Sequence, residues 1–265
     1  MRTTVAKIHI DNLYNNFQNI KKIVGKRKII GVVKANAYGH GLIEISRYLQ
    51  EFGIDYLAVA FVAEGIALRE AGIKIPILVL VPENDVSVEA SVDYDLDYAV
   101  EKFEVVKAIS SYAKQKGKTA KVHIYIDTGM GRDGISAERS IELVGKCFNL
   151  ENINPIGIMS HFASSESDRE YTILQLQRFL NLVESLKANG FEFEMHHIAN
   201  TGALFSAPES YLDTVRPGLA LYGYVHNQTL APFEFKPVME IFSKVISLRR
   251  LKPGESVGYG RKFIA

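Results

Sequence analysis

The chain has 265 residues, nearly half of them hydrophobic, so it is long enough to bury the core of one large α/β domain. Lys and Arg total 31 and Asp and Glu total 30, which gives no bulk electrostatic reason to expect a nucleic-acid or anionic-membrane partner. No run approaches the roughly 20 apolar residues that span a membrane, and residues 1–5 lack the apolar core of a signal peptide, so we expect a cytoplasmic protein.

Short apolar runs alternate with amphipathic segments along most of the chain. Strands are predicted at 29–33, 56–60, 77–81, 97–100, 121–127, 155–161, 195–199 and 214–222. Helices are predicted at 12–24, 42–52, 63–71, 102–115, 137–147 and 169–188, with 85–91 as a weaker candidate. Asp11 precedes the first helix and is predicted to cap its N-terminus.

Eight strands that alternate with helices favour parallel pairing, because parallel strands need crossover connections. Residues 77–81 are apolar throughout, which is typical of a strand buried on both faces. We therefore predict an α/β fold, a (β/α)8 TIM barrel over roughly residues 28–230. An open doubly wound sheet has the same strand pattern and stays an alternative.

The two ends of the chain fall outside this repeat. Residues 1–10 alternate in polarity like a separate strand, and residues 238–251 are strand-like before a turn at 252–255. We expect three parts: an N-terminal strand at 1–10 that packs with a β domain, a barrel at 11–232, and the truncated start of a C-terminal β domain at 233–265.

Lys34 directly follows the first predicted strand and would face the mouth of a barrel, where such folds place their chemistry. Partial burial and nearby cations lower the pKa of an amine and make it a nucleophile toward aldehydes. A lysine at the end of a strand can equally be structural. Tyr38 follows four residues later, in a turn that its glycines allow.

Other strand ends carry polar groups that suit an anionic ligand. A guanidinium lies among three glycines after the fifth strand, although a solvated surface turn would look the same. The later strand ends add an imidazole, an amide–hydroxyl pair and a second guanidinium beside a glycine. These residues are Arg132, His161, Asn200, Thr201, Arg216 and Gly218. Together with Lys34 they predict a site for an anionic cofactor that reacts with one amine.

Two other candidate sites are not favoured. Cys147 lies on the apolar face of a predicted helix, so a small buried side chain is a better interpretation than a catalytic thiol. His196 and His197 are adjacent on a predicted strand and would point to opposite faces, so no metal site is predicted.

These motifs resemble alanine racemases, which are pyridoxal 5'-phosphate enzymes built from a (β/α)8 barrel and a C-terminal β domain. The segment VKANAYGHG at 33–41 resembles the cofactor motif of that family. Segments 127–134, 160–162, 200–201 and 215–224 follow in the order of its other site segments, and GYG at 258–260 resembles the segment with its second base.

The resemblance implies a role for each matching residue. Lys34 would attach to the cofactor and act as a base on one face of the substrate alanine, and Tyr259 would act on the other face. Tyr259 would come from the partner subunit of a homodimer. The resemblance further implies phosphate contacts from Tyr38, Asn200, Thr201 and the backbone amides near Gly218 and Leu219, and ring contacts from Arg132, His161 and Arg216.

Three differences from the family pattern bear on function. Tyr125 stands where some members carry a modified lysine that tethers the arginine, so Arg132 must be oriented otherwise. Thr201 replaces the more usual serine and keeps a hydroxyl. Family chains continue about a hundred residues further, so we expect a fragment that binds cofactor with little turnover.

A cell-wall role in D-alanine supply follows only from the resemblance. The alternatives are a cofactor-binding carrier module without turnover, a serine racemase of the same family, and a decarboxylase on the same barrel, for which no additional motif is present.

Overall fold

The computed structural model describes residues 4–82 and 88–265, and the chain divides into two compact units. The larger unit comprises His9–Val238, and the smaller one combines the segment up to Ile8 with Met239–Ala265. Each unit is described by itself below.

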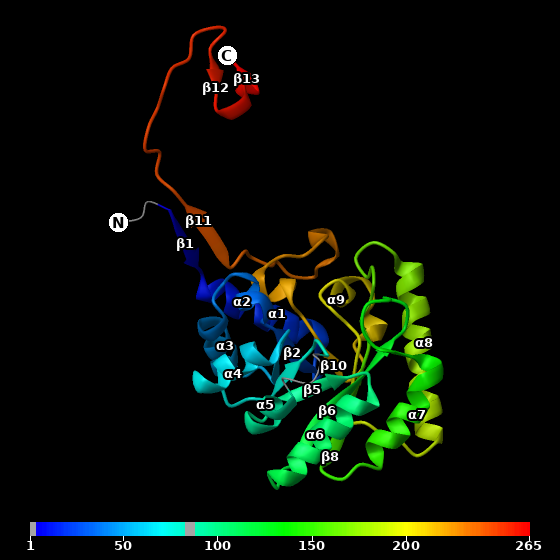
Figure 1. Cartoon of the computed structure of the whole chain (residues 1–265). Helices are drawn as coiled ribbons and strands as arrows, with labels where there is room; N and C mark the ends of the chain where they lie inside the picture. The colour runs from blue at the N-terminus through cyan, green and yellow to red at the C-terminus, as the bar shows by residue number, and fades with distance from the viewer. Residues whose placement is uncertain (1–3, 83–87) are drawn as a thin grey trace. The chain divides into compact units, whose positions relative to one another are not determined.

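The larger unit is a parallel barrel of eight strands (Figure 1). The strands are β2 (Lys28–Val32), β3 (Tyr56–Val59), β4 (Ile77–Val79), β5 (Asp97–Val100), β6 (Ala120–Asp127), β8 (Ile153–Met159), β9 (Met195–His197) and β10 (Thr214–Val215). A two-residue strand, β7 (Ile135–Ser136), pairs with the end of β6. The Arg216 backbone N–H donates to the Ala199 carbonyl at 2.9 Å where β9 and β10 end, which brings the two edges of the sheet together. The predicted (β/α)8 fold is confirmed.

Helices follow most of the strands and cover the outside of the barrel (Figure 1). The longer ones are α1 (Ile10–Val24), α3 (Leu42–Glu51), α4 (Val62–Glu70), α6 (Phe103–Gln115), α7 (Ala137–Phe148) and α8 (Arg169–Ala188). The shorter turns are α2 (Lys34–Tyr38), α5 (Val88–Asp93), α9 (Ala203–Ser206), η1 (Pro208–Ser210), η2 (Leu219–Tyr222) and η3 (Gln228–Leu230). In α1, Leu13, Phe17, Ile20 and Val24 recur at helical spacing and are buried, which is why this segment packs as a helix.

The barrel interior is filled by every second side chain of the strands, as the period of a β-strand requires. Its apolar members are Ile30, Val32, Tyr56, Ala58, Leu78, Ala99, Tyr125, Ile156, Met159 and Met195. The same alternation directs Asp97, His123 and His197 inward, where all three are buried. The interior therefore has a polar stripe among its apolar layers.

The structure corrects several predicted boundaries. His9, not Asp11, is the N-cap of α1, and Asp11 lies in its first turn, where a carboxylate still favours the helix dipole. The last strand is only Thr214–Val215, because the apolar residues that follow form the buried 3-10 turn η2. The weak helix prediction at 85–91 falls partly outside the described residues; α5 begins at Val88.

In the smaller unit, β1 (Val5–Ile8) pairs antiparallel with β11 (Met239–Phe242), and β12 (Ser256–Val257) pairs with β13 (Phe263–Ile264). The strand predicted at 238–251 is therefore too long. The predicted turn at 252–255 is confirmed, with the Glu255 N–H donating to the Lys252 carbonyl at 3.0 Å. The domain boundaries expected from the sequence stay a prediction.

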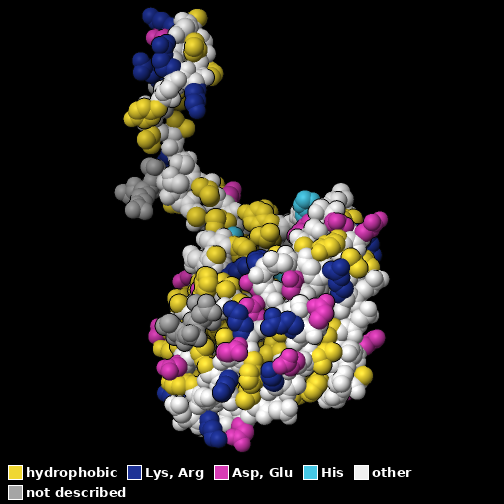
Figure 2. All heavy atoms as spheres, turned by 45° about the vertical axis from the view of Figure 1, so that its right-hand side comes forward, with side chains coloured by type: hydrophobic (Ala, Val, Ile, Leu, Met, Phe, Trp, Pro, Cys, Tyr) yellow, Lys and Arg dark blue, Asp and Glu magenta, His cyan; other side chains and the backbone are white. Residues whose placement is uncertain are grey.

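The distribution of surface charges and the burial of the single cysteine agree with what the sequence predicts. Lys and Arg side chains are interspersed with Asp and Glu over the barrel face in Figure 2. Among the described residues, no helix combines the length and apolar character needed to cross a bilayer. Cys147 is buried on α7, and burial raises the pKa of its thiol to about 12, so the prediction of a small buried side chain is confirmed.

Candidate active site

A cavity of about 550 Å³ opens at the C-terminal ends of the barrel strands. It gathers every predicted site residue except Tyr259: Lys34, Tyr38, Arg132, His161, Asn200, Thr201, Arg216, Gly218 and Leu219. Parallel strands end on one side of a barrel, so residues from widely separated segments meet there. Apolar side chains such as Val32, Leu80 and Met159 line the rest of the cavity.

Lys34 begins α2, and the four residues after it have left-handed backbone angles. Residues 35–38 have φ values of 52–56°, and none of them is glycine. L-residues pay about 1–2 kcal/mol each for this conformation, so tertiary contacts must hold it. The Leu42 N–H donates to the Asn36 side chain at 2.8 Å, and the Ala35 N–H donates to Glu64 at 2.7 Å.

Glu64 joins this turn to the next strand end. Its second carboxylate oxygen accepts from the backbone N–H groups of Ala60 and Phe61, at 2.7 and 3.2 Å. One side chain at the start of α4 thus fixes both the turn after Lys34 and the end of β3. Sequence reasoning missed Glu64, although an acidic residue in the first turn of a helix is the usual signal for such capping.

The ammonium group of Lys34 is partly buried and lies in an electropositive setting. Burial is the largest cause that lowers its pKa, followed by Arg132, with a smaller effect from Arg216; Glu64 and Asp133 oppose the shift. A lysine in such surroundings is unprotonated more often at neutral pH and is a better nucleophile toward a carbonyl.

Tyr38, Thr201 and Gly218 form one corner of the cavity. A Cβ on Gly218 would lie 2.9 Å from the Tyr38 hydroxyl, so only glycine lets that ring take its place. The Thr201 hydroxyl accepts from the backbone N–H groups of Gly218 and Ala220, at 3.0 and 3.2 Å. Because these two N–H groups already donate to Thr201, the hydroxyls of Tyr38 and Thr201 are the donors that this corner offers to an anionic group.

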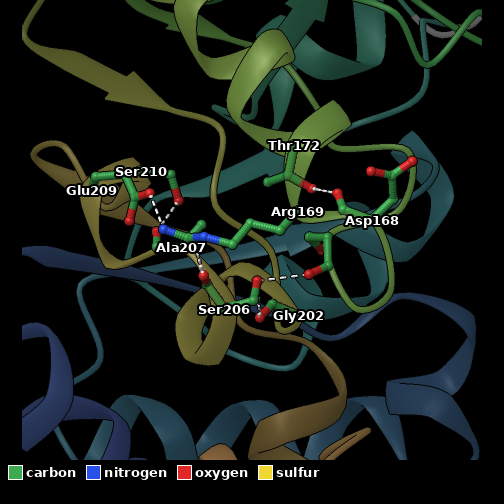
Figure 3. Close-up of polar contacts among 9 residues, drawn as sticks. Asp168, Arg169, Thr172, Gly202, Ser206, Ala207, Glu209 and Ser210 are labelled. Atoms are coloured by element: carbon green, nitrogen blue, oxygen red, sulfur yellow. Dashed lines mark hydrogen bonds and ion pairs between the residues drawn. The ribbon is translucent and has the colours of Figure 1, made fainter.

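The turn that includes Thr201 is anchored to the start of α8 (Figure 3). Arg169 contacts the Ser206 carbonyl and pairs with Glu209 at 2.8 Å, and the Ser206 hydroxyl donates to the Ser165 carbonyl at 2.6 Å. Asn200 is held by the Ser165 hydroxyl at 2.7 Å. These bonds fix the Asn200–Thr201 pair on a rigid base.

Arg132 lies in a loop built around Asp127, which accepts from the N–H groups of Gly129, Met130 and Gly131 at 2.8–3.1 Å. The guanidinium is about half exposed, and its Nε donates to the adjacent Asp133 at 3.0 Å.

Arg216 is buried and donates to atoms at the ends of two neighbouring strands, β8 and β9. Its Nη1 contacts the His197 ring at 2.6 Å and the His197 carbonyl at 2.8 Å, and its Nη2 donates to the Ser160 carbonyl at 2.5 Å. Nη2 also lies 3.3 Å from Nδ1 of His161. Burial, then Arg216, Arg132 and Lys34, lower the pKa of His161 to about 3, so its ring is neutral and accepts from Arg216.

Comparison with known proteins agrees with this geometry. Residues 8–226 match the family model described as alanine racemase, N-terminal domain. The alanine racemase of Clostridium tetani is 41% identical over 267 residues, which cover 99% of this chain and 69% of that protein. The chain belongs to the alanine racemase family.

Solved structures in and near the alanine racemase family have the same fold. The alanine racemase of Clostridium difficile 630 has a TM-score of 0.93 at 36% identity, covering 99% of this chain and 70% of that one. The histidine racemase of Leuconostoc mesenteroides has a TM-score of 0.88 at 28% identity, covering 100% and 72%.

Tyr259, expected from the alanine racemase resemblance to be a base, lies in the smaller unit. It begins the 3-10 turn η4 (Tyr259–Arg261), and its side chain is fully exposed at 104%. The barrel cavity and Tyr259 thus belong to different units of this chain.

The two adjacent histidines of β9 point to opposite faces, as predicted. His196 pairs with Asp213 at 2.8 Å, whereas His197 is fully buried beside Arg216. Within residues 4–82 and 88–265, no group of three or more His, Cys, Asp or Glu side chains is placed to hold a metal ion.

Proposed function

We propose that this chain interconverts L- and D-alanine, using pyridoxal 5'-phosphate attached to Lys34. The observation that carries the proposal is the position of the Lys34 amine, whose pKa is lowered in a cavity that also contains Arg132 and Arg216. An amine of this kind reacts with an aldehyde, and the surrounding cations suit an anionic partner.

The residues present fit that cofactor. The cavity of about 550 Å³ has room for a small aromatic ring beside Lys34, and its lining is largely apolar. At its other corner, the hydroxyls of Tyr38 and Thr201 are donors for a phosphate, and the Gly218 N–H holds the Thr201 hydroxyl in place. We therefore assign the phosphate to that corner, together with Asn200 and the backbone at Leu219.

When bound, the cofactor supplies an aldehyde for the substrate amine and a ring that stabilises negative charge at Cα. Lys34 would take or return the Cα proton on one face, because burial and the nearby arginines lower the pKa of its amine. Arg216 has only donors to offer and accepts no proton, so it orients the ring without becoming an acid–base group. His161, which stays neutral, accepts from Arg216 and helps to fix it.

Racemisation also needs a proton donor on the opposite face, and we propose Tyr259 for this role. The support is the family resemblance of residues 258–260, and a homodimer in which the partner subunit supplies the tyrosine belongs to the same proposal. A cytoplasmic location and a role in D-alanine supply for the cell wall likewise rest on family membership.

We propose alanine as the substrate because the relative that is 41% identical is named an alanine racemase. Serine fits the same chemistry, and a histidine racemase has the same fold. A cofactor carrier without turnover is the second candidate, favoured by the full exposure of Tyr259.

The test combines a spectrum with isotope exchange. We expect pyridoxal 5'-phosphate to give an absorbance band near the visible edge, which Lys34→Ala abolishes and Lys28→Ala, at the exposed other end of β2, leaves intact. A band that survives Lys34→Ala would refute the assignment of Lys34.

Exchange of Cα deuterium from solvent into both enantiomers of alanine indicates a racemase. Exchange into one enantiomer only would mean that Lys34 works and Tyr259 does not. No exchange, with the band present, would favour the carrier. Parallel assays with serine and histidine test the substrate.

A further inference from the structure

A row of buried polar side chains crosses the barrel interior from Arg216 to the opposite end of the strands. Arg216 Nη1 lies 2.6 Å from Nδ1 of His197, and Nε2 of His197 lies 2.8 Å from Nδ1 of His123. Nε2 of His123 faces Asp97 at 3.7 Å, and the Tyr56 hydroxyl donates to the same carboxylate oxygen. Asp97 and Tyr56 begin their strands, whereas His197 ends β9, so the row runs the length of the barrel.

The hydrogen bonds determine where each proton sits. A guanidinium only donates, so Nδ1 of His197 must accept and the proton of that ring must be on Nε2. His197 is neutral, because burial, followed by Arg216 and His123, lowers its pKa well below 6.5. The Nε2–H of His197 then donates to Nδ1 of His123, which places the proton of His123 on Nε2, toward Asp97.

Arg216 needs a remote counter-charge. Its side-chain acceptors in the described part of the chain are the rings of His197 and His161 and the carbonyls of Ser160, His197 and Ile198, all of them uncharged. A guanidinium buried without a carboxylate partner is costly unless dipoles around it are aligned.

We propose that His197 and His123 are positioning residues that couple Arg216 to the Asp97 carboxylate: hydrogen bonds polarised in one direction join Arg216, His197 and His123, and the last step, from Nε2 of His123 to Asp97, is electrostatic at 3.7 Å. The negative charge of Asp97 favours the proton on Nε2 of His123. Nδ1 of His123 then accepts from Nε2–H of His197, and Nδ1 of His197 accepts from Arg216. The last acceptor, Nδ1 of His197, then holds the Arg216 guanidinium in one orientation at the floor of the cavity.

A glycine on the neighbouring strand leaves space for the His123 ring. His123 on β6 lies opposite Gly157 on β8, and a Cβ on Gly157 would lie 2.7 and 2.8 Å from Cε1 and Cγ of the His123 ring. Nε2 of His123 is buried and has no hydrogen-bond partner among the described residues, so Asp97 is its electrostatic partner at longer range.

Asp97 interacts with two residues besides His123. Tyr56 donates to it, and Arg69 lies within electrostatic reach while its own donors go to backbone carbonyls of residues such as Ile73 and Tyr94. The Tyr56 hydroxyl and the Arg69 guanidinium are thus, with His123, polar groups that interact with this carboxylate.

The direct test is nitrogen-15 NMR of the histidine rings in the unaltered protein without cofactor. We expect Nε2 protonated and Nδ1 unprotonated in both His123 and His197. Protonation of Nδ1 in either ring would overturn the proposal. Because Arg216 sets both tautomers through His197, we expect Asp97→Asn to keep the proton on Nε2 of His123 and to shift the nitrogen-15 resonance of that atom, which faces the lost charge; an unchanged resonance would remove Asp97 from the row.

Two variants of His123 separate positioning from packing. His123→Asn keeps an acceptor oxygen for His197, whereas His123→Leu removes it. We expect His123→Leu to mix the His197 tautomers and raise the Kd for pyridoxal 5'-phosphate about tenfold, and His123→Asn to stay within about threefold of the parent. Ser110→Ala, which removes a buried bond to the Glu151 carbonyl outside the barrel interior, controls for lost stability alone.

The binding measurement rests on the proposed function, whereas the tautomer measurement does not. Correct tautomers without any cofactor binding would refute the function and leave the chain of hydrogen bonds standing. Equal affinities for His123→Leu and His123→Asn, with cofactor bound, would refute the positioning role.

Discussion

Gly157→Ala gives a sharp test of how tightly the barrel interior is packed. The new methyl group would overlap the His123 ring, lying 2.7 and 2.8 Å from two of its carbons and closer still to Nδ1. Displacing the ring costs about 1–3 kcal/mol for overpacking. Loss of the 2.8 Å bond to His197 leaves buried polar atoms unpaired and costs about 1–3 kcal/mol more. We expect the free energy of unfolding to fall by about 2–6 kcal/mol.

The assay is equilibrium unfolding in urea, followed by circular dichroism, with Gly145→Ala as the matched control. Gly145 lies inside α7, and a Cβ there would meet only the Phe191 ring, at an ordinary 3.4 Å. Alanine should therefore stabilise that helix by about 0.5–1 kcal/mol. A Gly157→Ala protein that unfolds at the same urea concentration as the parent would refute the packing argument.

Three further predictions concern buried polar groups. Asn16→Ala should lower the free energy of unfolding by about 3 kcal/mol in urea titrations, because the Asn16 amide bonds the Leu221 carbonyl and both backbone groups of Lys236. The pKa of His161 is lowered to about 3 in the folded protein, so its ring binds fewer protons there than in the unfolded chain. The free energy of unfolding should therefore fall as the pH drops below about 6.5, by about 2 kcal/mol at pH 5. His161→Gln should remove this contribution to the pH dependence of stability. Cys147, buried with its pKa raised to about 12, should react with a thiol reagent only after urea unfolds the chain; rapid labelling of the native protein would contradict its burial.

The strand count was predictable because each barrel strand is a short apolar run between turn signals. Prediction failed where the same apolar signal has another cause. Leu221 and Tyr222 are buried as a strand would be, but they belong to the 3-10 turn η2. In the smaller unit, Val245 and Ile246 look like strand residues and are highly exposed, with no strand assigned to them. Periodicity reports burial, and burial alone does not distinguish a strand from a buried turn.

Most residues of the cavity were predictable because functional side chains of a barrel lie at the C-terminal ends of its strands. Each of Lys34, Arg132 and Arg216 comes directly after a strand or in the loop that follows one, so the barrel brings them together. His123 was not predictable in the same way. It lies in the middle of β6, where a single histidine has no distinctive spacing and resembles any buried polar residue. Its role depends on Gly157 and His197, which are remote in sequence.

The turn after Lys34 is where local preference and fold disagree most. Residues 35–38 include two alanines, good formers of right-handed helix, yet all four adopt left-handed angles. A right-handed turn would cost less locally, so the reason must be tertiary. Glu64 holds the Ala35 N–H, and the ring of Tyr38 must reach the space that Gly218 leaves open. The strained turn therefore places Lys34 and Tyr38 in one cavity, where we propose that they bind opposite ends of the cofactor, and backbone strain of this kind is typical of functional sites.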